Sequence, residues 1–264
     1  MKPDSDADNI VQIARSFVDA RRAGRALPDY PGAMPTTLDE AYAVQDIAIE
    51  FAGSTVAGWK VGKIDPPVAG TNRLAGPIFA DQIVSNDGSV VAMPVFADGF
   101  AAAEAEFLLR IGAMPDPAKT SYTIDEARDL IDAVHVGIEI ASSPFPGINQ
   151  NGPGVTISDF GNNNGLVVGD GIPNWRDVDL NEWQVRLCIN DHEVGAATTA
   201  TMLDGPFGAA RFLFELMAAR GIALTPGQWI STGAVTGVHA VSIGDRIEAT
   251  FDGRMTIGCI IKAR

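Results

Sequence analysis

The sequence predicts a β-rich α+β fold, with helices gathered toward the N-terminus and strands forming most of the rest. Short apolar runs typical of strands recur from residue 56 to the end of the chain. Few helical patterns are interleaved with them, which disfavours a doubly wound sheet. Asp252-Gly253, between the last two runs, is a strong hairpin signal.

Two helices are expected before the first strand. Residues 9–23 carry apolar side chains at helical spacing. A break rich in proline and glycine follows over 28–35. Thr37 and Glu40 then form a capping box that opens the second helix, and Gly53 stands where its C-terminal cap is expected.

Two further helices are expected later in the chain. A second capping box, Thr123 to Glu126, opens a short helix that is predicted to end near Val134. Another helix is expected over about 207–220, where Gly221 stops it.

The remaining apolar runs are the expected strands. Asn190-Asp191 is a weaker hairpin signal than Asp252-Gly253. We expect one catalytic domain over 1–264, with about 1–55 as a helical lead-in and 56–264 as the β-rich core. The expected strands are 56–62, 89–95, 104–111, 135–141, 164–169, 183–190, 228–233, 245–251 and 254–262.

Composition excludes several classes of protein. Apolar residues make up 46% of the chain and charged residues 20%, which is typical of a globular protein rather than a disordered one. The net charge of −14 argues against nucleic acid and anionic membranes as partners. No apolar run is long enough for a transmembrane helix, and the acidic N-terminus lacks the features of a signal peptide, so a cytoplasmic location is expected.

The most informative segment places two glutamates in an apolar strand. Side chains alternate between the faces of a strand, so Glu104 and Glu106 project to one side while Ala105 and Phe107 project to the other. Glu139 stands in the same way in a second apolar strand. Three carboxylates, without cysteine or histidine at ligand spacing, suit Mg²⁺ or Mn²⁺. The alternative is that they are solvated positions, or that Arg110 pairs with them.

A lysine between two glycines is the second candidate. Lys60 shares a strand face with Gly58 and Gly62, which leaves room for a ligand against the backbone. A desolvated lysine shifts its pKa readily and can act as a general acid or base. An exposed strand lysine is the alternative interpretation.

Taken together, these segments resemble the 2-oxopent-4-enoate hydratase and 4-oxalocrotonate decarboxylase family, within the fumarylacetoacetate hydrolase superfamily. The resemblance covers residues 10–264, and its motifs appear in the family's order. They are Gly58–Gly62, Ala103–Phe107, Gly137–Glu139, Ile157–Asp159 with Gly165–Gly169, Leu203–Pro206, and Ser231–Gly237 with Ile243–Phe251.

The resemblance implies a fold, a cofactor and an assembly. The fold is a rolled, mixed β-sheet core with peripheral helices, usually assembled into homo-oligomers. Glu104, Glu106 and Glu139 correspond to ligands of Mg²⁺ or Mn²⁺, Lys60 lies beside the substrate, and Asp159 matches a position near the active site, where it would help to position water.

Two loops depart from the family pattern and bear on the substrate. After Lys60, the segment 63–73 replaces a stretch of small hydroxyl residues, which makes Lys63 and Arg73 candidates for binding a substrate carboxylate. The segment 159–164 also differs and ends on Asn164. The resemblance further places Asn164, and Thr232 and Gly233 of the C-terminal motif, among the substrate-binding candidates.

The implied activity is hydration of a 2-hydroxy-2,4-dienoate to a 4-hydroxy-2-oxo acid, with Lys60 moving a proton during ketone formation. Decarboxylation of a 4-oxalocrotonate-type 2-oxo acid and hydrolysis of a C–C bond, as in acylpyruvate and fumarylacetoacetate hydrolases, are the alternatives. The hydrolysis usually needs a base such as histidine, and His135 lies on the predicted face of Glu139. A non-catalytic partner subunit is the remaining alternative.

Overall fold

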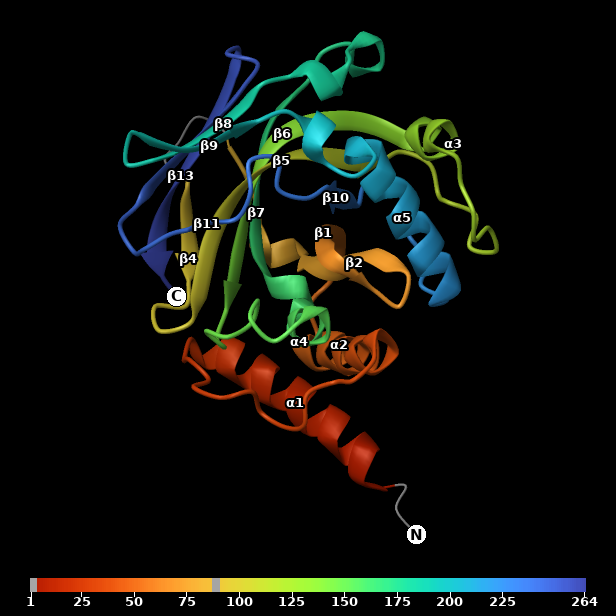
Figure 1. The fold of residues 1–264 in the computed structure, drawn as a ribbon, viewed down its shortest axis with the longest axis vertical. Coiled ribbons are helices and arrows are strands. Elements are labelled where there is room, and N and C mark those ends of the chain that lie inside the picture. The colour runs from red at the N-terminus through yellow and green to blue at the C-terminus, as the bar shows by residue number, and fades with distance from the viewer. Residues whose placement is uncertain (1–3, 87–90) are drawn as a thin grey trace.

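The computed structural model describes residues 4–86 and 91–264. Helices α1 (Asp4–Ala23) and α2 (Leu38–Ala52) pack against each other at one end of the molecule (Figure 1). The Thr37 side chain accepts from the Glu40 amide, Glu40 bonds back to the Thr37 amide, and Gly53 is left-handed with φ 67°. Both predicted ends of α2 are therefore confirmed, while α1 begins earlier than the periodicity indicated.

The larger sheet is mixed and runs in the order β2-β1-β10-β5-β6-β7-β3, with β11 added to β5. Strand β1 pairs with β10 in parallel and with β2 antiparallel, and β5, β6 and β7 pair antiparallel. Its strands are β1 (Val56–Val68), β2 (Thr71–Phe79), β3 (Ile83–Ser85), β5 (Phe100–Ile111), β6 (Ile131–Ser143), β7 (Asn163–Gly171), β10 (Trp229–Ser231) and β11 (His239–Ala240).

The smaller sheet has the order β4-β13-β12-β8-β9 and is also mixed, since β13 pairs with β4 in parallel. Asp252 and Gly253 join β12 to β13 with φ of 52° and 64°, as a two-residue turn with two positive φ angles requires. Asn190 and Asp191 join β8 to β9 in the same way. Both predicted hairpins are confirmed. The strands are β4 (Ala92–Val95), β8 (Val185–Ile189), β9 (His192–Ala197), β12 (Arg246–Phe251) and β13 (Met255–Ala263).

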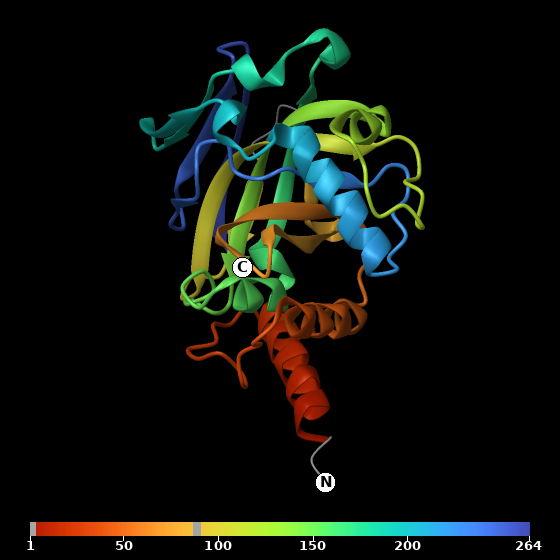
Figure 2. The ribbon, with the colours of Figure 1, turned by 45° about the vertical axis from the view of Figure 1, so that its right-hand side comes forward.

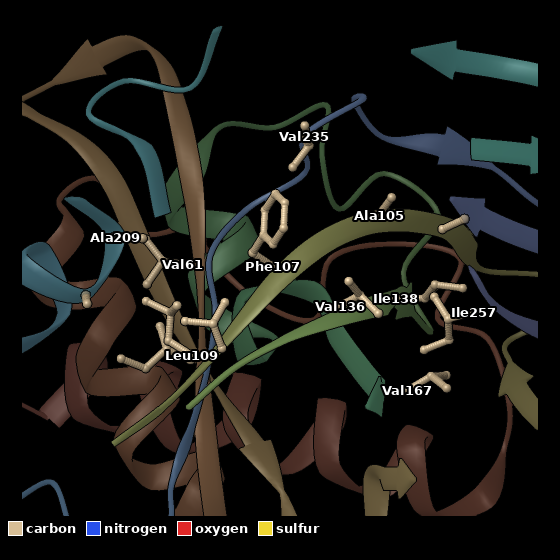
Figure 3. Packing of buried hydrophobic residues seen from close by; sticks show 14 of the residues in the cluster. Val61, Ala105, Phe107, Leu109, Val136, Ile138, Val167, Ala209, Val235 and Ile257 are labelled. Atoms are coloured by element: carbon tan, nitrogen blue, oxygen red, sulfur yellow. The ribbon is translucent and has the colours of Figure 1, made fainter. Parts of the chain in front are cut away.

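The main hydrophobic core lies where the two sheets face each other. One face of β5 contributes Ala105, Phe107 and Leu109, and β6 contributes Val136 and Ile138 (Figure 3). The Phe107 ring makes edge-to-face contacts with the rings of Trp183 and Phe251. Because alternate residues of β5 and β6 fill this core, the residues between them face the other side of the sheet.

Helix α5 (Gly205–Ala219) lies beside β1 and β2 in both ribbon views (Figures 1 and 2). The short helix α4 (Pro153–Ser158) packs between α2 and the strands. Helix α3 (Ile124–Asp129) has the predicted capping box but ends well before Val134, so that prediction was wrong. Strand β6 begins at Ile131. Residues that the pattern assigned to the end of the helix pair with β5 instead.

The expected strands are confirmed with changed ends: β1, β5, β6 and β7 are longer than expected, whereas β8, β10 and β12 are shorter. Positions 89 and 90 of the expected strand 89–95 lie outside the described residues. Among the described residues, no helix has the length and apolar content that crossing a bilayer needs. Among the α-helices and strands of residues 4–86 and 91–264, the expected set did not contain β2, β3, β11 and α4, and β9 was implied only by the hairpin signal at Asn190-Asp191.

Candidate active site

Three buried carboxylates meet on the face of the large sheet that points away from the main core. Glu104 and Glu139 are direct cross-strand partners on β5 and β6, and Glu106 follows two residues along β5. Glu104 is 5% exposed, and the other two are fully buried. One oxygen from each carboxylate lies within 4.8 Å of the others. The sequence therefore placed all three side chains on the correct face.

The cluster holds one close positive charge. Lys60, on β1, is 6% exposed, and its Nζ lies 3.4 Å from Oε1 of Glu139. Three carboxylates beside one ammonium leave a net negative charge in a largely buried region, which is costly unless something more compensates it. Arg110, the alternative partner, pairs instead with Asp132 at the surface and does not compensate the cluster.

Neighbouring donors form hydrogen bonds with some of the carboxylate oxygens, while others have no hydrogen-bond partner in the described part of the chain. The Asn163 amide donates to Oε1 of Glu139 at 2.9 Å. Oε2 of Glu106 accepts from the Gly233 amide at 2.9 Å and from the Ser231 hydroxyl. Oε1 of Glu106 and Oε2 of Glu139 are buried without a partner in the described part of the chain.

These bare oxygens fit a divalent cation. All the converging ligand atoms are carboxylate oxygens, the donors that Mg²⁺ and Mn²⁺ prefer, and no cysteine or histidine belongs to the described cluster. A cation would also supply the positive charge that Lys60 alone does not.

The pKa values of the clustered side chains shift because the cluster is buried and has too little positive charge. Burial raises the pKa of Glu104 to about 7, although Lys60 opposes it. Burial and the charges of Glu139 and Glu104 raise the pKa of Glu106 well above its ordinary value. Burial alone would lower the pKa of Lys60, but the three carboxylates outweigh it and raise that pKa.

A dependence of stability on pH follows for the metal-free protein. The pKa of Glu104 rises from its ordinary value of 4.5 to about 7 in the fold, so the folded state binds more protons between these values. Stability should therefore fall as the pH rises through this window. Added Mg²⁺ should raise the melting temperature more at about pH 8 than at about pH 5.5, where protons compete for the carboxylates.

Differential scanning fluorimetry at constant ionic strength would measure this, with NaCl as the control for salt. An equal effect of Mg²⁺ at both pH values would contradict a carboxylate metal site.

A cavity of about 780 Å³ opens beside Glu104 and Lys60. The substrate-binding candidates Lys63, Arg73, Thr232 and Gly233 also line it. The Lys63 side chain is 58% exposed and pairs with Asp65. Arg73 is 8% exposed and contacts Asp204, the residue that precedes α5, through Nη2.

Two predicted site residues do not line the cavity. Asp159 is fully buried, and its carboxylate binds Arg21 and the Ser143 hydroxyl. The Asn164 oxygen accepts from Arg21, and its amide donates to the Pro94 carbonyl. This geometry favours a positioning role for Asp159 over a direct catalytic one, and it places Asn164 outside the cavity wall.

The histidines are also away from the cavity. Nδ1 of His135 lies 2.8 Å from the Gly169 carbonyl oxygen, and the ring stacks edge-on against Trp229. His239 contacts the Thr236 carbonyl. No histidine is among the described residues that line the cavity.

Comparison with known proteins gives consistent names. No family model matches the chain. The 2-keto-4-pentenoate hydratase 1 of Dechloromonas aromatica (strain RCB) is 29% identical over 225 residues, which cover 81% of this chain and 82% of the relative. The 4-oxalocrotonate decarboxylase of Pseudomonas putida is 25% identical over 247 residues, covering 91% and 90%. The chain is related to the 2-keto-4-pentenoate hydratases and 4-oxalocrotonate decarboxylases.

Two solved structures share the fold of this chain. The 4-oxalocrotonate decarboxylase from Pseudomonas putida G7, complexed with magnesium and adipate, superposes with a TM-score of 0.80 at 20% identity, covering 97% of this chain and 98% of that one. Fumarylpyruvate hydrolase from Pseudomonas aeruginosa, in complex with Mn²⁺ and pyruvate, gives 0.60 at 15% identity over 78% and 89%. The fumarylacetoacetate hydrolase-like fold expected from the motifs is confirmed.

Sequence reasoning missed four residues that hold the glutamates or Asp159. Ser231 and Asn163 hold the glutamates, and each stands next to a predicted site residue, Thr232 or Asn164. Arg21 and Ser143 bind Asp159. The adjacent motifs gave a signal for the first pair, but nothing local marked Arg21 or Ser143.

Proposed function

We propose that this protein is a hydro-lyase that adds water to a 2-hydroxy-2,4-dienoate, giving a 4-hydroxy-2-oxo acid. The observation that carries the proposal is the buried cluster of three glutamates with bare oxygens, Lys60 in contact with it, and a cavity at its side. Relatives named 2-keto-4-pentenoate hydratase support the reaction class.

Glu104, Glu106 and Glu139 would hold Mg²⁺ or Mn²⁺ in this proposal. Such a cation supplies positive charge that stabilises negative charge on the carboxylate and 2-oxygen of a 2-oxo acid. Structures complexed with magnesium and with Mn²⁺ are known for proteins of the same fold.

Lys60 carries the proton transfer in this proposal. Lys60 lines the cavity with Nζ 3.4 Å from Glu139, so its ammonium is placed to donate a proton to C5 of the dienol while the 2-hydroxyl proton passes to water. The resulting ketone is conjugated with the C3–C4 double bond. Water then adds its oxygen to C4 and a proton to C3, which balances the hydration.

Thr232 and Gly233 form the cavity wall next to the glutamates. The Thr232 hydroxyl donates to the Phe107 carbonyl at 2.8 Å, and the Gly233 amide donates to Glu106. We therefore assign them to holding the wall and the glutamate, with only their remaining surface in contact with substrate.

The arginine in the cavity keeps the decarboxylase alternative open. Nε and Nη1 of Arg73 have no hydrogen-bond partner among the described residues, and Asp204 is shared with Arg211. A buried guanidinium with free donors suits a second carboxylate, as a dicarboxylic 2-oxo acid of the 4-oxalocrotonate type carries. C–C bond hydrolysis is less favoured, because no histidine lines the described cavity.

An ultraviolet assay of EDTA-stripped protein on 2-hydroxypenta-2,4-dienoate tests the proposal. We expect loss of the dienol absorbance only after Mg²⁺ or Mn²⁺ is restored, with 4-hydroxy-2-oxopentanoate as product. Release of CO₂ from 4-oxalocrotonate, without turnover of the dienoate, would replace the hydratase with the decarboxylase. No turnover and no bound divalent metal would favour a non-catalytic partner subunit.

Arg73→Ala separates the two substrate classes. A charge-assisted hydrogen bond to a second carboxylate is worth about 1.5–3 kcal/mol, so KM for a dicarboxylate should rise about 10–100-fold. Turnover of a monocarboxylic dienoate should change little. Arg211→Ala is the matched control, since Arg211 binds the same Asp204 but does not line the cavity. Equal effects of Arg73→Ala on both substrates would refute this role.

We also propose that the chain forms a single catalytic domain, assembles into homo-oligomers and works in the cytoplasm. The relationship to the hydratases supports these proposals. Light scattering after size-exclusion chromatography would test the assembly.

A further inference from the structure

A buried arginine of the N-terminal helix reaches into the region behind the cavity. Arg21, on α1, is 5% exposed and binds Asp159 through two parallel contacts, Nε to Oδ1 at 2.5 Å and Nη2 to Oδ2 at 2.9 Å. Ser143 donates to the same carboxylate at 2.6 Å. Arg21 also donates to the Ser142 carbonyl and the Asn164 side chain. The guanidinium therefore fixes Asp159 in both position and orientation.

Asp159 begins a backbone turn that needs external support. The next three residues, Phe160, Gly161 and Asn162, all have positive φ, at 56°, 63° and 67°. Two of them are not glycine, and such residues rarely adopt this conformation unless their surroundings impose it. Asn162 donates its backbone N–H to the Asp159 carbonyl at 2.8 Å, so the ion-paired aspartate is also the base of the turn.

The turn lies against Lys60. A Cβ atom built on Gly161 would come within 3.0 Å of Cδ of Lys60. One built on Gly76, on the neighbouring strand β2, would come within 2.1 Å of the Phe160 carbonyl oxygen. The turn is thus pressed between Gly76 and the aliphatic chain of Lys60. A shift of the turn away from Lys60 would give the Lys60 side chain space to move away from Glu139.

The segment after the turn contacts the glutamate cluster itself. Asn163 donates to the same Oε1 of Glu139 that faces Lys60 Nζ. The turn therefore controls both partners of the Lys60–Glu139 contact. It reaches Lys60 through Gly161 and Glu139 through Asn163.

We propose that Arg21 is a positioning residue, whose ion pair with Asp159 fixes the 160–162 turn and thereby holds Lys60 against Glu139. The inference rests on the proposed function for its effect on turnover, because Lys60 is the proton donor there. Its effect on the Lys60 side chain does not depend on the reaction. The N-terminal helix accordingly belongs to the active-site framework.

Arg21→Gln tests the inference, with Arg22→Gln as the matched control. Arg22 is the next residue of α1 and donates to carbonyls at the end of α2, away from the turn. We expect kcat of Arg21→Gln to fall on the order of 10²-fold, the loss that a small misplacement of a reacting group produces, with KM changed much less. Arg22→Gln should leave both constants unchanged.

Lys60 can be observed without any assay. The chain has five lysines, so protein labelled with ¹³C at lysine Cε gives a small set of NMR signals, and Lys60→Met identifies the one from Lys60. Arg21→Gln should shift or broaden that signal, and Arg22→Gln should not. If wild-type protein does not turn over the dienoate, the proposed reaction fails, while this signal still tests the positioning role.

A folded Arg21→Gln protein with unchanged kcat and an unchanged Lys60 signal would overturn the inference, even if its melting temperature fell. Arg21→Lys covers the case in which the glutamine variant does not fold. It keeps the buried charge but loses the two parallel contacts, and the same changes in smaller degree are expected from it. An Arg21→Lys protein identical to wild type in both measurements would also overturn the inference.

Discussion

Glu106→Gln should abolish metal-dependent turnover while leaving the protein folded. Glu106 is fully buried and its Oε1 has no partner among the described residues, so this oxygen is available to a cation. The amide removes one negative ligand with almost no change of shape. Stabilisation by a metal is worth several kcal/mol, so kcat/KM should drop by about 10³-fold or more.

The metal-free variant should be at least as stable as the metal-free wild type. A glutamine oxygen can still accept from Ser231 and Gly233, and the variant no longer buries a carboxylate whose pKa is raised by burial and by like charges. Glu106→Gln should accordingly melt at the same temperature or higher without metal, and gain less when Mg²⁺ is added. This combination separates a lost ligand from a damaged fold.

Calorimetric titration with Mn²⁺ and the dienoate assay measure the two effects. Glu193→Gln, the same exchange at the surface of β9, is the control and should retain both metal binding and activity. Activity that survives in Glu106→Gln would show that the assignment of the ligand is wrong.

The glutamates could be placed from the sequence because their geometry is local. Alternation along a strand decides the face of Glu104 and Glu106 without knowledge of the partner strands. The ends of α2 and the turn at Asp252-Gly253 were predictable for the same reason, since capping and turn formation depend on a few consecutive residues.

Features that depend on distant contacts were not predictable. Strand β2 contains Gly76 and Pro77, which read as strand breakers, yet Gly76 is required because the Phe160 carbonyl lies where its side chain would be. Arg21 looks like an ordinary polar position of an amphipathic helix, and its partner Asp159 is 138 residues away. The predicted end of α3 was too late for the same reason, because the residues after Asp129 pair with the distant strand β5.

The two segments that depart from the family pattern have different positions relative to the cavity. Lys63 and Arg73 of the segment 63–73 line the cavity, and their binding of a substrate carboxylate stays a prediction. In the segment 159–164, Gly161 and Asn162 of the left-handed turn line the cavity beside Lys60, whereas Asp159 and Asn164 do not reach it. The sequence located both departures, but only the fold distinguishes a cavity wall from its support.

Lys60→Met should lower kcat by about 10²–10⁴-fold, the range expected when a general acid or base is lost. Methionine keeps most of the aliphatic chain that packs against Gly161, so the turn should remain in place. Metal affinity should be maintained or increased, because the substitution removes a positive charge 3.4 Å from Glu139 and leaves the three carboxylates free to bind a cation.

The comparison of turnover with metal affinity decides the role of Lys60. Lys119→Met is the matched control, since Lys119 pairs with Glu126 and does not line the cavity. A large loss of kcat with metal binding intact assigns the proton transfer to Lys60. Parallel losses of both would mean that Lys60 instead holds the carboxylates together, and the proton donor would have to be sought among the other groups that line the cavity.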